Sequence, residues 1–410
     1  MQAKTITISR LTCEMQEGLV VVEGSPRLGW VMESPENGTR QSAYEIDIRE
    51  AFTGRSVWNS GKVYSTQSQL VSIEGADIRP DNPFNYSWRV RVWDETDAPS
   101  EWSREAKFRS ASSRLSEGKW IGAITRQNAH LPEGRKFHGG ELKKPEVKAA
   151  WEAVDTLAKK SICLRRTFQV GDRAEGNTNR QSGKKIVEAT AYVCGLGFYE
   201  FSLNGKKVGN SEFAPLWSDY DKTVYYNTYD VTEQLRHGEN AVGILLGNGF
   251  YNVQGGRYRK LQISFGPPTL LFELVINYED GTSTTLRSDN DWKYDFSPVT
   301  FNCIYGGEDY DARREQKGWN QVGFDDSHWR PVVIQEAPKG ILRPQMAPPV
   351  KIMERYDIQK VTKLNAEQVA SASVSTKRTV DPSAFVLNMG QNLAGFPEIT
   401  VRGKRGQKVT

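Results

Sequence analysis

The sequence predicts an all-β protein made of β-sandwich domains in tandem, with one inserted helix. Short runs of alternating apolar residues recur along the chain, as at residues 43–49 and 86–93, and polar turns separate them. Asn204 and Gly205 stand between two such runs, which is a strong signal for a hairpin because both central positions of a type I′ turn need a positive φ. The length of 410 residues suggests two to four domains, at roughly 100–200 residues per domain.

Residues 1–112 are predicted to form a fibronectin type III-like sandwich. Alternation places Tyr44, Ile46 and Ile48 on one face of a strand. In residues 86–93 the apolar side chains again fall on one face, with two arginines on the other, and a polar turn follows at residues 94–100. About seven strands in about 100 residues is typical of this fold.

Residues 119–345 are predicted to form a jelly-roll sandwich. Strands are expected at residues 189–194, 199–203, 241–246 and 270–278. Residues 126–160 interrupt this pattern as an insertion, and residues 145–157 show helical spacing of Val147, Trp151 and Val154 after Pro145. Residues 171–185 are polar and predict a loop.

A proline-rich boundary at residues 344–349 precedes a third β unit, residues 350–410. Residues 396–401 predict a strand, and residues 402–407 a turn. The return strand has only begun at residue 410, which predicts a truncated β-sandwich with an unpaired edge.

Composition argues against several classes of protein. The net charge is +4 without a basic stripe, so no nucleic acid partner is expected. No run of 18 apolar residues occurs, so no membrane span is expected. The first residues lack the apolar core of a signal peptide, which indicates a cytoplasmic protein as written, or a periplasmic or extracellular one if the start was trimmed.

The four cysteines, Cys13, Cys163, Cys194 and Cys303, are too widely spaced for a zinc site. Cys163 and Cys194 lie in apolar runs typical of a core, although the sequence leaves a disulfide open.

Ten segments in order, covering nearly the whole chain, resemble bacterial α-L-rhamnosidases. Each segment is weak evidence alone, and the longest is YVCGLGFYEFSLNGKKVG at residues 192–209. The others are PRLGW (26–30), RQSAYEI (40–46), YSWRVRVWD (86–94), KWIG (119–122), APLWSDYDK (214–222) with LGNGFY (246–251), YGGEDYDAR (305–313), GFDDSHW (323–329) and NMGQNLAGF (388–396).

The resemblance implies an architecture and an activity for the intact protein. The three units correspond to the family's fibronectin-like domain, its jelly-roll N domain, which binds rhamnose in some members, and the start of its next sandwich. The family's catalytic domain is an (α/α)6 barrel further along the chain, and its acid and base carboxylates hydrolyse terminal α-L-rhamnose with inversion. Such a barrel needs about a dozen helices of roughly 11–12 residues, so no residue of this chain is assigned a catalytic role.

Two loops are candidates for contact with a sugar. Trp217, Asp219 and Tyr220 combine aromatic rings with a carboxylate, and Asn248, Tyr251 and Asn252 follow a buried strand. Rings that stack on sugar faces beside hydrogen-bonding groups are typical of carbohydrate sites. The alternatives are that these aromatic residues belong to the jelly-roll core, and that the loops pack against the catalytic barrel.

Glu308, Asp309 and Asp311 form the densest acidic cluster. Carboxylates clustered on one loop suit calcium, and a catalytic pair would need carboxyl groups roughly 6.5–9.5 Å apart. The structural alternative, which we favour, is pairing with Arg313 and Arg314. No other cofactor is indicated.

Three functions follow from these observations. The chain is the N-terminal part of an α-L-rhamnosidase that acts on a rhamnose-containing glycoside or polysaccharide together with a barrel domain. Alternatively it is a stand-alone carbohydrate-binding protein without catalysis, or a gene fragment. The sequence does not distinguish among them.

Overall fold

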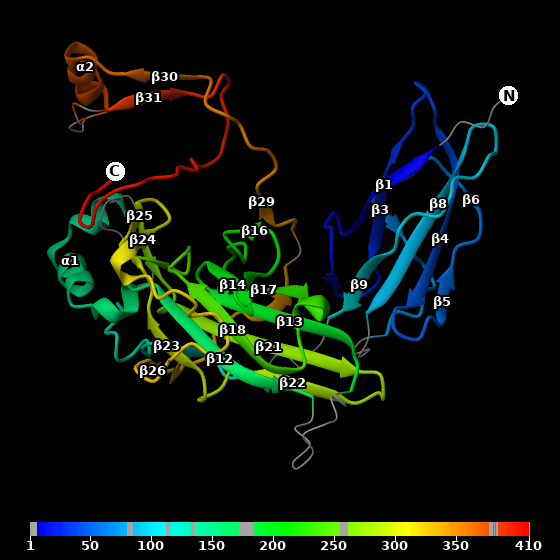
Figure 1. Cartoon of the computed structure of the whole chain (residues 1–410), viewed down its shortest axis with the longest axis horizontal. Coiled ribbons are helices and arrows are strands. Elements are labelled where there is room, and N and C mark those ends of the chain that lie inside the picture. Colours follow the sequence, from blue (N-terminus) through cyan, green and yellow to red (C-terminus); the bar gives the residue numbers. More distant parts are fainter. Residues whose placement is uncertain are drawn as a thin grey trace. The chain divides into compact units, whose positions relative to one another are not determined.

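The computed structural model has two units, residues 1–350 and residues 351–410 (Figure 1). It describes residues 6–79, 85–111, 115, 117–132, 136–171, 184–254, 261–345, 347–376, 380, 382 and 384–409. The loop predicted at residues 171–185 falls largely outside the described residues. Among the described residues, no helix is both long enough and apolar enough to cross a membrane.

The first part of unit 1 is an immunoglobulin-like sandwich of two sheets. One sheet has the order β1-β3-β7 and the other β2-β9-β8-β4-β5, with β6 also paired to β4. The strands are β1 Thr7–Cys13, β2 Val20–Val22, β3 Arg27–Glu33, β4 Gln41–Glu50, β5 Ser56–Asn59, β6 Val63–Tyr64, β7 Val71–Ser72, β8 Tyr86–Asp94 and β9 Ala106–Ser110.

The alternation read from the sequence sets the faces of this sandwich. β4 and β8 pair antiparallel, with Ile46 opposite Val90 and Ile48 opposite Trp88. These four side chains are buried in one core with Trp30. Because successive side chains of a strand point to opposite faces, the two arginines of β8 point away from that core. Both arginines lie against the ring of Trp102, at 4.6 and 4.8 Å.

The second sandwich of unit 1 has two larger sheets. Their orders are β27-β10-β21-β13-β17-β28, with β22 on β21, and β15-β14-β18-β12-β23-β26. The strands are β10 Ile121–Gly122, β12 Ile162–Val170, β13 Ile186–Leu196, β14 Tyr199–Leu203, β15 Lys206–Lys207, β17 Thr223–Asp230, β18 Gly238–Leu246, β21 Thr269–Tyr278, β22 Ser283–Arg287, β23 Lys293–Phe296, β26 Arg330–Pro331, β27 Val333–Ile334 and β28 Ile341–Pro344.

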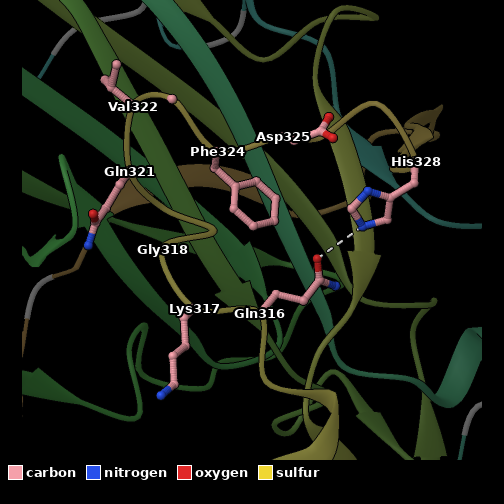
Figure 2. Close-up of a pocket in the computed structure, with 9 residues that line it drawn as sticks. Gln316, Lys317, Gly318, Gln321, Val322, Phe324, Asp325 and His328 are labelled. Atoms are coloured by element: carbon pink, nitrogen blue, oxygen red, sulfur yellow. Dashed lines mark hydrogen bonds between the residues drawn. The ribbon is translucent and has the colours of Figure 1, made fainter.

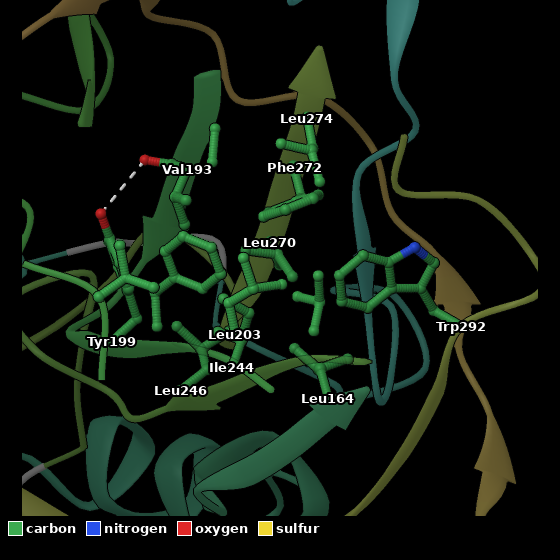
Figure 3. Packing of buried hydrophobic residues seen from close by; sticks show 14 of the residues in the cluster. Leu164, Val193, Tyr199, Leu203, Ile244, Leu246, Leu270, Phe272, Leu274 and Trp292 are labelled. Carbon is green, nitrogen blue, oxygen red and sulfur yellow. Dashed lines mark hydrogen bonds between the residues drawn. The ribbon is translucent and has the colours of Figure 1, made fainter. Parts of the chain in front are cut away.

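The core of this sandwich lies between the two sheets. Figure 3 shows Phe272 and Leu274 of β21 facing the same interior as Leu164, Ile244 and Trp292. All five side chains are at most 1% exposed. The nearly continuous apolar run of β21 follows from burial on both faces: Phe272 and Leu274 face this core, and Leu271 lies in a second buried cluster.

Shorter elements decorate the second sandwich. They are β11 Lys136–His138, the 3-10 helices η2 Gly139–Lys143 and η3 Thr156–Lys159, α1 Pro145–Glu152, β16 Ser211–Glu212, η4 Thr232–Gln234, β19 Asn252–Val253, β20 Leu261–Ser264, β24 Val299–Cys303, β25 Gly307–Tyr310 and η5 Ala312–Arg314. The strands β24 and β25 form a hairpin that pairs Asn302 with Glu308.

The inserted helix is shorter than its sequence pattern predicts. Val147, Trp151 and Val154 are buried together as expected, but α1 ends at Glu152 instead of residue 157. The Asp155 carboxylate accepts a hydrogen bond of 2.7 Å from the Leu157 N–H and begins η3. An aspartate that binds the backbone two residues ahead competes with continuation of a helix.

Unit 2 contains β29 Val350–Lys351, which starts in the last residue of unit 1, β30 Lys360–Lys363, α2 Ala366–Thr376 and β31 Phe385–Asn388. β30 and β31 pair antiparallel. The helix corrects the expectation of one helix in the chain. Its signal was a capping box: the Asn365 side chain accepts from the Gln368 N–H at 2.9 Å, and the Gln368 side chain from the Asn365 N–H at 3.0 Å.

The strand predicted at residues 396–401 is absent from the structure. This segment has no regular structure, and Phe396, Ile399 and Val401 are each more than half exposed. A strand gains most of its stability from hydrogen bonds and side-chain pairs with a neighbouring strand. Among the described residues, β30 and β31 form a sheet of two strands, and residues 396–401 are not part of it.

Candidate carbohydrate-binding surface

Five aromatic rings from four loops meet at one edge of the second sandwich. We call Phe198, Phe213, Trp217, Phe250 and Tyr305 the aromatic surface. The Phe250 ring is central: its centroid lies 5.2 Å from that of Trp217, 6.1 Å from that of Phe198 and 6.1 Å from that of Tyr305. Phe213 joins through Phe198, at 5.5 Å. The rings therefore form one continuous patch.

Glycines bring the loops of the aromatic surface together. A Cβ on Gly197 would lie 1.9 Å from the carbonyl oxygen of Gly247, and one on Gly249 would lie 2.8 Å from the Gly197 carbonyl carbon. Gly197 also has a φ of +131°, which side chains disfavour. The Gly247 N–H donates to the Phe198 carbonyl oxygen at 2.8 Å. This close approach holds Phe198 and Phe250 side by side.

Three rings of the aromatic surface are open to solvent. Trp217 is 61% exposed, Phe213 50% and Tyr305 44%. Large exposed apolar groups gathered in one patch mark interaction sites more often than scattered ones do. Aromatic faces of this kind stack on the C–H faces of sugars.

Of the first predicted loop, Trp217 and Asp219 lie at the surface. The Asp219 carboxylate pairs with Lys222 at 3.2 Å and accepts from the Asp221 N–H at 3.3 Å. Tyr220, in contrast, is 2% exposed, and its ring packs against Tyr251 and Phe265 at centroid distances of 5.1 Å. Tyr220 and Tyr251 therefore serve the core, as the alternative reading expected.

Asn248 and Asn252 are buried and hold the loop from within. The Asn248 amide donates to the Lys159 carbonyl oxygen at 2.9 Å and to Asn302 Oδ1 at 3.0 Å. The Asn252 amide donates to the Ala158 carbonyl oxygen and to Asn248 Oδ1, both at 2.8 Å. These bonds join the loop to η3 and to β24, so both asparagines support the aromatic surface from below.

The three residues of the acidic cluster differ in their surroundings. Glu308 and Asp309 lie on β25 and are exposed. The Asp311 carboxylate accepts two hydrogen bonds of 2.8 Å from the Arg313 guanidinium, and these hold the pKa of Asp311 well below its usual range. Among the described residues no group of three metal-ligating side chains is placed to hold a metal ion. The structural alternative therefore accounts for Asp311.

The structure also shows a hollow that the sequence analysis did not identify. It has a volume of about 710 Å³, and Gln316, Lys317, Phe324, Asp325 and His328 line it. We call it the Phe324 hollow, because Figure 2 shows that ring at its centre. Its signal in the sequence is GFDDSHW at residues 323–329, where an aromatic ring, two carboxylates and a histidine stand within seven residues.

Sheets that pair strands distant in sequence, with loops gathered at their edges, place the protein in the class of multi-domain β-sandwich proteins. Three family descriptions match it. They are "Rha78A-like, N-terminal immunoglobulin domain" over residues 8–113, "Alpha-L-rhamnosidase N-terminal domain" over residues 184–354 and "Bacterial alpha-L-rhamnosidase concanavalin-like domain" over residues 378–410. Three stretches of the chain are thus similar to domains of bacterial α-L-rhamnosidases.

Whole proteins and solved structures agree with these matches. The chain is 33% identical over 404 residues to an α-L-rhamnosidase of Formosa agariphila, covering 95% of this chain and 38% of that relative. An α-L-rhamnosidase structure from Dictyoglumus thermophilum superposes with a TM-score of 0.62 at 29% identity, covering 88% of this chain and 38% of that one. A Streptomyces avermitilis α-L-rhamnosidase complexed with L-rhamnose gives a TM-score of 0.65 at 25% identity, covering 87% and 48%. The chain thus spans less than half the length of each.

Proposed function

We propose that this chain is the N-terminal part of an α-L-rhamnosidase-type glycoside hydrolase, whose intact form cleaves terminal α-L-rhamnose from glycosides or polysaccharides. The observation that carries the proposal is the match of 95% of the chain to an α-L-rhamnosidase. The acid and base carboxylates of the proposed inverting hydrolysis would lie in the barrel domain that the resemblance implies.

Within that protein, we assign carbohydrate binding to the aromatic surface. Trp217, Phe213 and Tyr305 offer exposed rings, and Asp219 offers a carboxylate two residues from Trp217. Stacking on rings combined with hydrogen bonds to hydroxyls is the usual chemistry of sugar recognition. The rest of the two sandwiches supplies the scaffold, with Asn248 and Asn252 fixing the loops.

A stand-alone carbohydrate-binding protein is the second candidate. The exposed aromatic surface favours it, because that surface needs no catalytic partner to hold a sugar. A docking face for the barrel domain is the third use of the same rings. Sugar binding by this chain alone separates binding from docking.

The experiment is hydrolysis of an aryl α-L-rhamnoside, measured in parallel with the isolated chain and with the complete protein carrying it. We expect release of the aryl group by the complete protein and none by the isolated chain. No release by the complete protein under any condition would overturn the enzymatic proposal and leave the binding proposal to be judged by titration.

Calcium stays a prediction for Glu308 and Asp309, since arginines already neutralise Asp311. A calcium site would raise the thermal midpoint of unfolding when calcium is added and lower it with a chelator, because a ligand that binds the folded state stabilises it. An unchanged midpoint at millimolar calcium would remove the cluster from consideration.

A further inference from the structure

The Phe324 hollow is built on a fixed floor. Arg165 lies beneath the loop and is 1% exposed. Its guanidinium donates to the carbonyl oxygens of Trp319 at 2.9 Å and Gln321 at 3.1 Å, and it pairs with Asp326. These bonds tie three points of the loop to β12, so the lining residues are held in place before any ligand arrives.

The same arginine also supports the ring at the centre of the hollow. The guanidinium carbon of Arg165 lies 5.4 Å from the centroid of Phe324, within the range of a cation–π contact. Phe324 also meets Trp329 at 5.8 Å in an edge-to-face arrangement. The ring is therefore positioned by its neighbours in the protein, and Figure 2 shows it among the residues that line the hollow.

A chain of hydrogen bonds fixes the proton on His328. Gln316 Nε2 donates to the Asp295 carboxylate at 2.7 Å, and this assigns Gln316 Oε1 as the acceptor. That oxygen accepts from Trp329 Nε1 at 2.9 Å, and His328 Nε2 lies 3.3 Å from it. Because an amide oxygen only accepts, His328 Nε2 is the donor of this pair, and in the tautomer with its one proton on Nε2 the Nδ1 atom is an acceptor.

The lining groups select a particular kind of ligand. His328 Nδ1 and the exposed Asp325 carboxylate both accept hydrogen bonds, so the ligand must donate them. Lys317 and Asp325 both line the hollow and their charges are opposite, so the lining has no net charge to attract an ion, which favours a ligand without net charge. The Phe324 ring favours a ligand with an apolar face. A pyranose, with hydroxyl donors around a C–H face, meets all three conditions.

We propose that the Phe324 hollow is a saccharide-binding subsite separate from the aromatic surface, and that it takes a neutral pyranose unit. The choice of a sugar as ligand rests on the proposed function. The hollow is open rather than enclosed, so it admits a unit within a polysaccharide chain as well as a free monosaccharide.

The test is a titration of the whole chain with methyl α-L-rhamnopyranoside and with methyl β-D-glucopyranoside, followed by saturation-transfer NMR and calorimetry. His328→Ala removes one acceptor from an exposed position, and Phe324→Leu removes the π face while keeping an apolar side chain. His237→Ala is the matched control, because His237 is exposed and lies in the loop between η4 and β18. Each variant is checked for an unchanged melting midpoint.

We expect His328→Ala and Phe324→Leu each to weaken sugar binding about fivefold to tenfold, the effect of one hydrogen bond or stacking contact, and His237→Ala to leave it unchanged. Folded His328→Ala and Phe324→Leu variants that bind both probes like the parent chain would overturn the proposal. Absence of binding by the parent chain would overturn it as well.

A Trp217→Ala variant separates this proposal from the proposed function. Binding that is lost in Trp217→Ala and kept in His328→Ala assigns the sugar to the aromatic surface and overturns the subsite. Binding that survives Trp217→Ala and weakens in His328→Ala supports the subsite. Hydrolysis by the complete protein is a third, independent readout, since it tests the enzymatic proposal without reference to either surface.

Discussion

Arg109 Nη1 lies 2.8 Å from Glu188 Oε1, and both side chains are about 5% exposed. The pair joins β9 of the first sandwich to β13 of the second. Glu188 Oε2 also accepts from the Asn85 N–H at 3.0 Å. Nearby, Lys107 of β9 and Asp230 of β17, the strand that pairs with β13, make a more exposed ion pair at 2.7 Å. The two sandwiches therefore meet through a buried charge pair and an exposed one.

The buried pair gives the first prediction. Glu188→Ala should lower the free energy of unfolding by about 3–5 kcal/mol, because it leaves the Arg109 guanidinium buried without its counter-ion. Lys107→Ala, at the exposed pair, should cost less than about 1 kcal/mol. Urea unfolding measures both. The double variant Arg109→Met with Glu188→Leu should recover most of the loss; equal costs for the buried and exposed variants would contradict this account.

The second prediction concerns pH. Burial raises the pKa of the Glu188 carboxyl above its ordinary value of 4.5, against the opposing attraction of Arg109. A carboxyl with a higher pKa in the folded state holds its proton more tightly there. Its contribution to stability is therefore largest below the unfolded pKa and is lost as the pH rises through the folded pKa.

Subtracting the unfolding free energy of Glu188→Gln from that of the parent chain isolates this titration, since glutamine does not titrate. We expect the difference to fall as the pH rises from about 4 to about 7. A difference that rises over this interval would show that the carboxyl is stabilised in its charged form.

The aromatic surface gives the third prediction. Trp217→Ala should weaken rhamnose binding at the aromatic surface at least tenfold and leave binding at the Phe324 hollow unchanged, since loss of an aromatic stacking contact costs about 0.5–1.5 kcal/mol beyond the apolar area lost with the indole. The melting midpoint should stay nearly unchanged, because Trp217 is 61% exposed. Tyr64→Ala is the control: Tyr64 is 76% exposed on β6, away from the aromatic surface. Equal binding by both variants would exclude Trp217 from the sugar contact.

The fourth prediction tests the glycine contact beneath the aromatic surface. Gly197→Ala should destabilise the chain by more than about 3 kcal/mol, because the new Cβ overlaps the Gly247 carbonyl oxygen and the φ of +131° strains any side chain. Gly281 also has a positive φ, +80°, but a Cβ added at Gly281 would point into open space. Gly281→Ala should cost only about 1 kcal/mol. Chemical unfolding of both variants gives the comparison, and similar costs would refute the close-contact argument.

The fifth prediction concerns the cysteines. All four are free and buried, and burial raises the pKa of the Cys13, Cys163 and Cys194 thiols above their ordinary range. Because the thiolate is the reactive form, none should react with a thiol reagent in the folded protein, and all four should react after denaturation. Lys339→Cys provides an exposed control thiol that reacts at once. Rapid labelling of the parent chain would disagree with the burial.

The strands were predictable from sequence because their side chains alternate. In β4, Tyr44, Ile46 and Ile48 are all buried as expected, and in β21 the inward series includes Leu270, Phe272 and Leu274. Boundaries were less predictable, because local hydrogen bonds such as that of Asp155 end a helix without changing its apolar pattern. The apolar pattern did not predict α2 for the same reason. The start of this helix is marked by the hydrogen bonds of the Asn365–Gln368 capping box and not by an apolar stripe.

The candidate site was only partly predictable. Trp217 and Tyr220 stand three residues apart in one loop, yet one is 61% exposed and the other 2%. Asn248 and Asn252 carry suitable groups for a sugar but use them on the backbone of η3. Partners of a loop residue come from distant segments, and the sequence does not show which of its groups they engage.

The sequence by itself determined the β-sandwich architecture, the faces of its main strands and the family resemblance, because the period of two along a strand is a local property. Only the tertiary structure decided which aromatic rings reach the solvent, because loops have no such period. It also decided that Arg165 lies beneath Phe324 and that Arg109 meets Glu188. These contacts join residues more than 70 positions apart, and they depend on how the sheets pack.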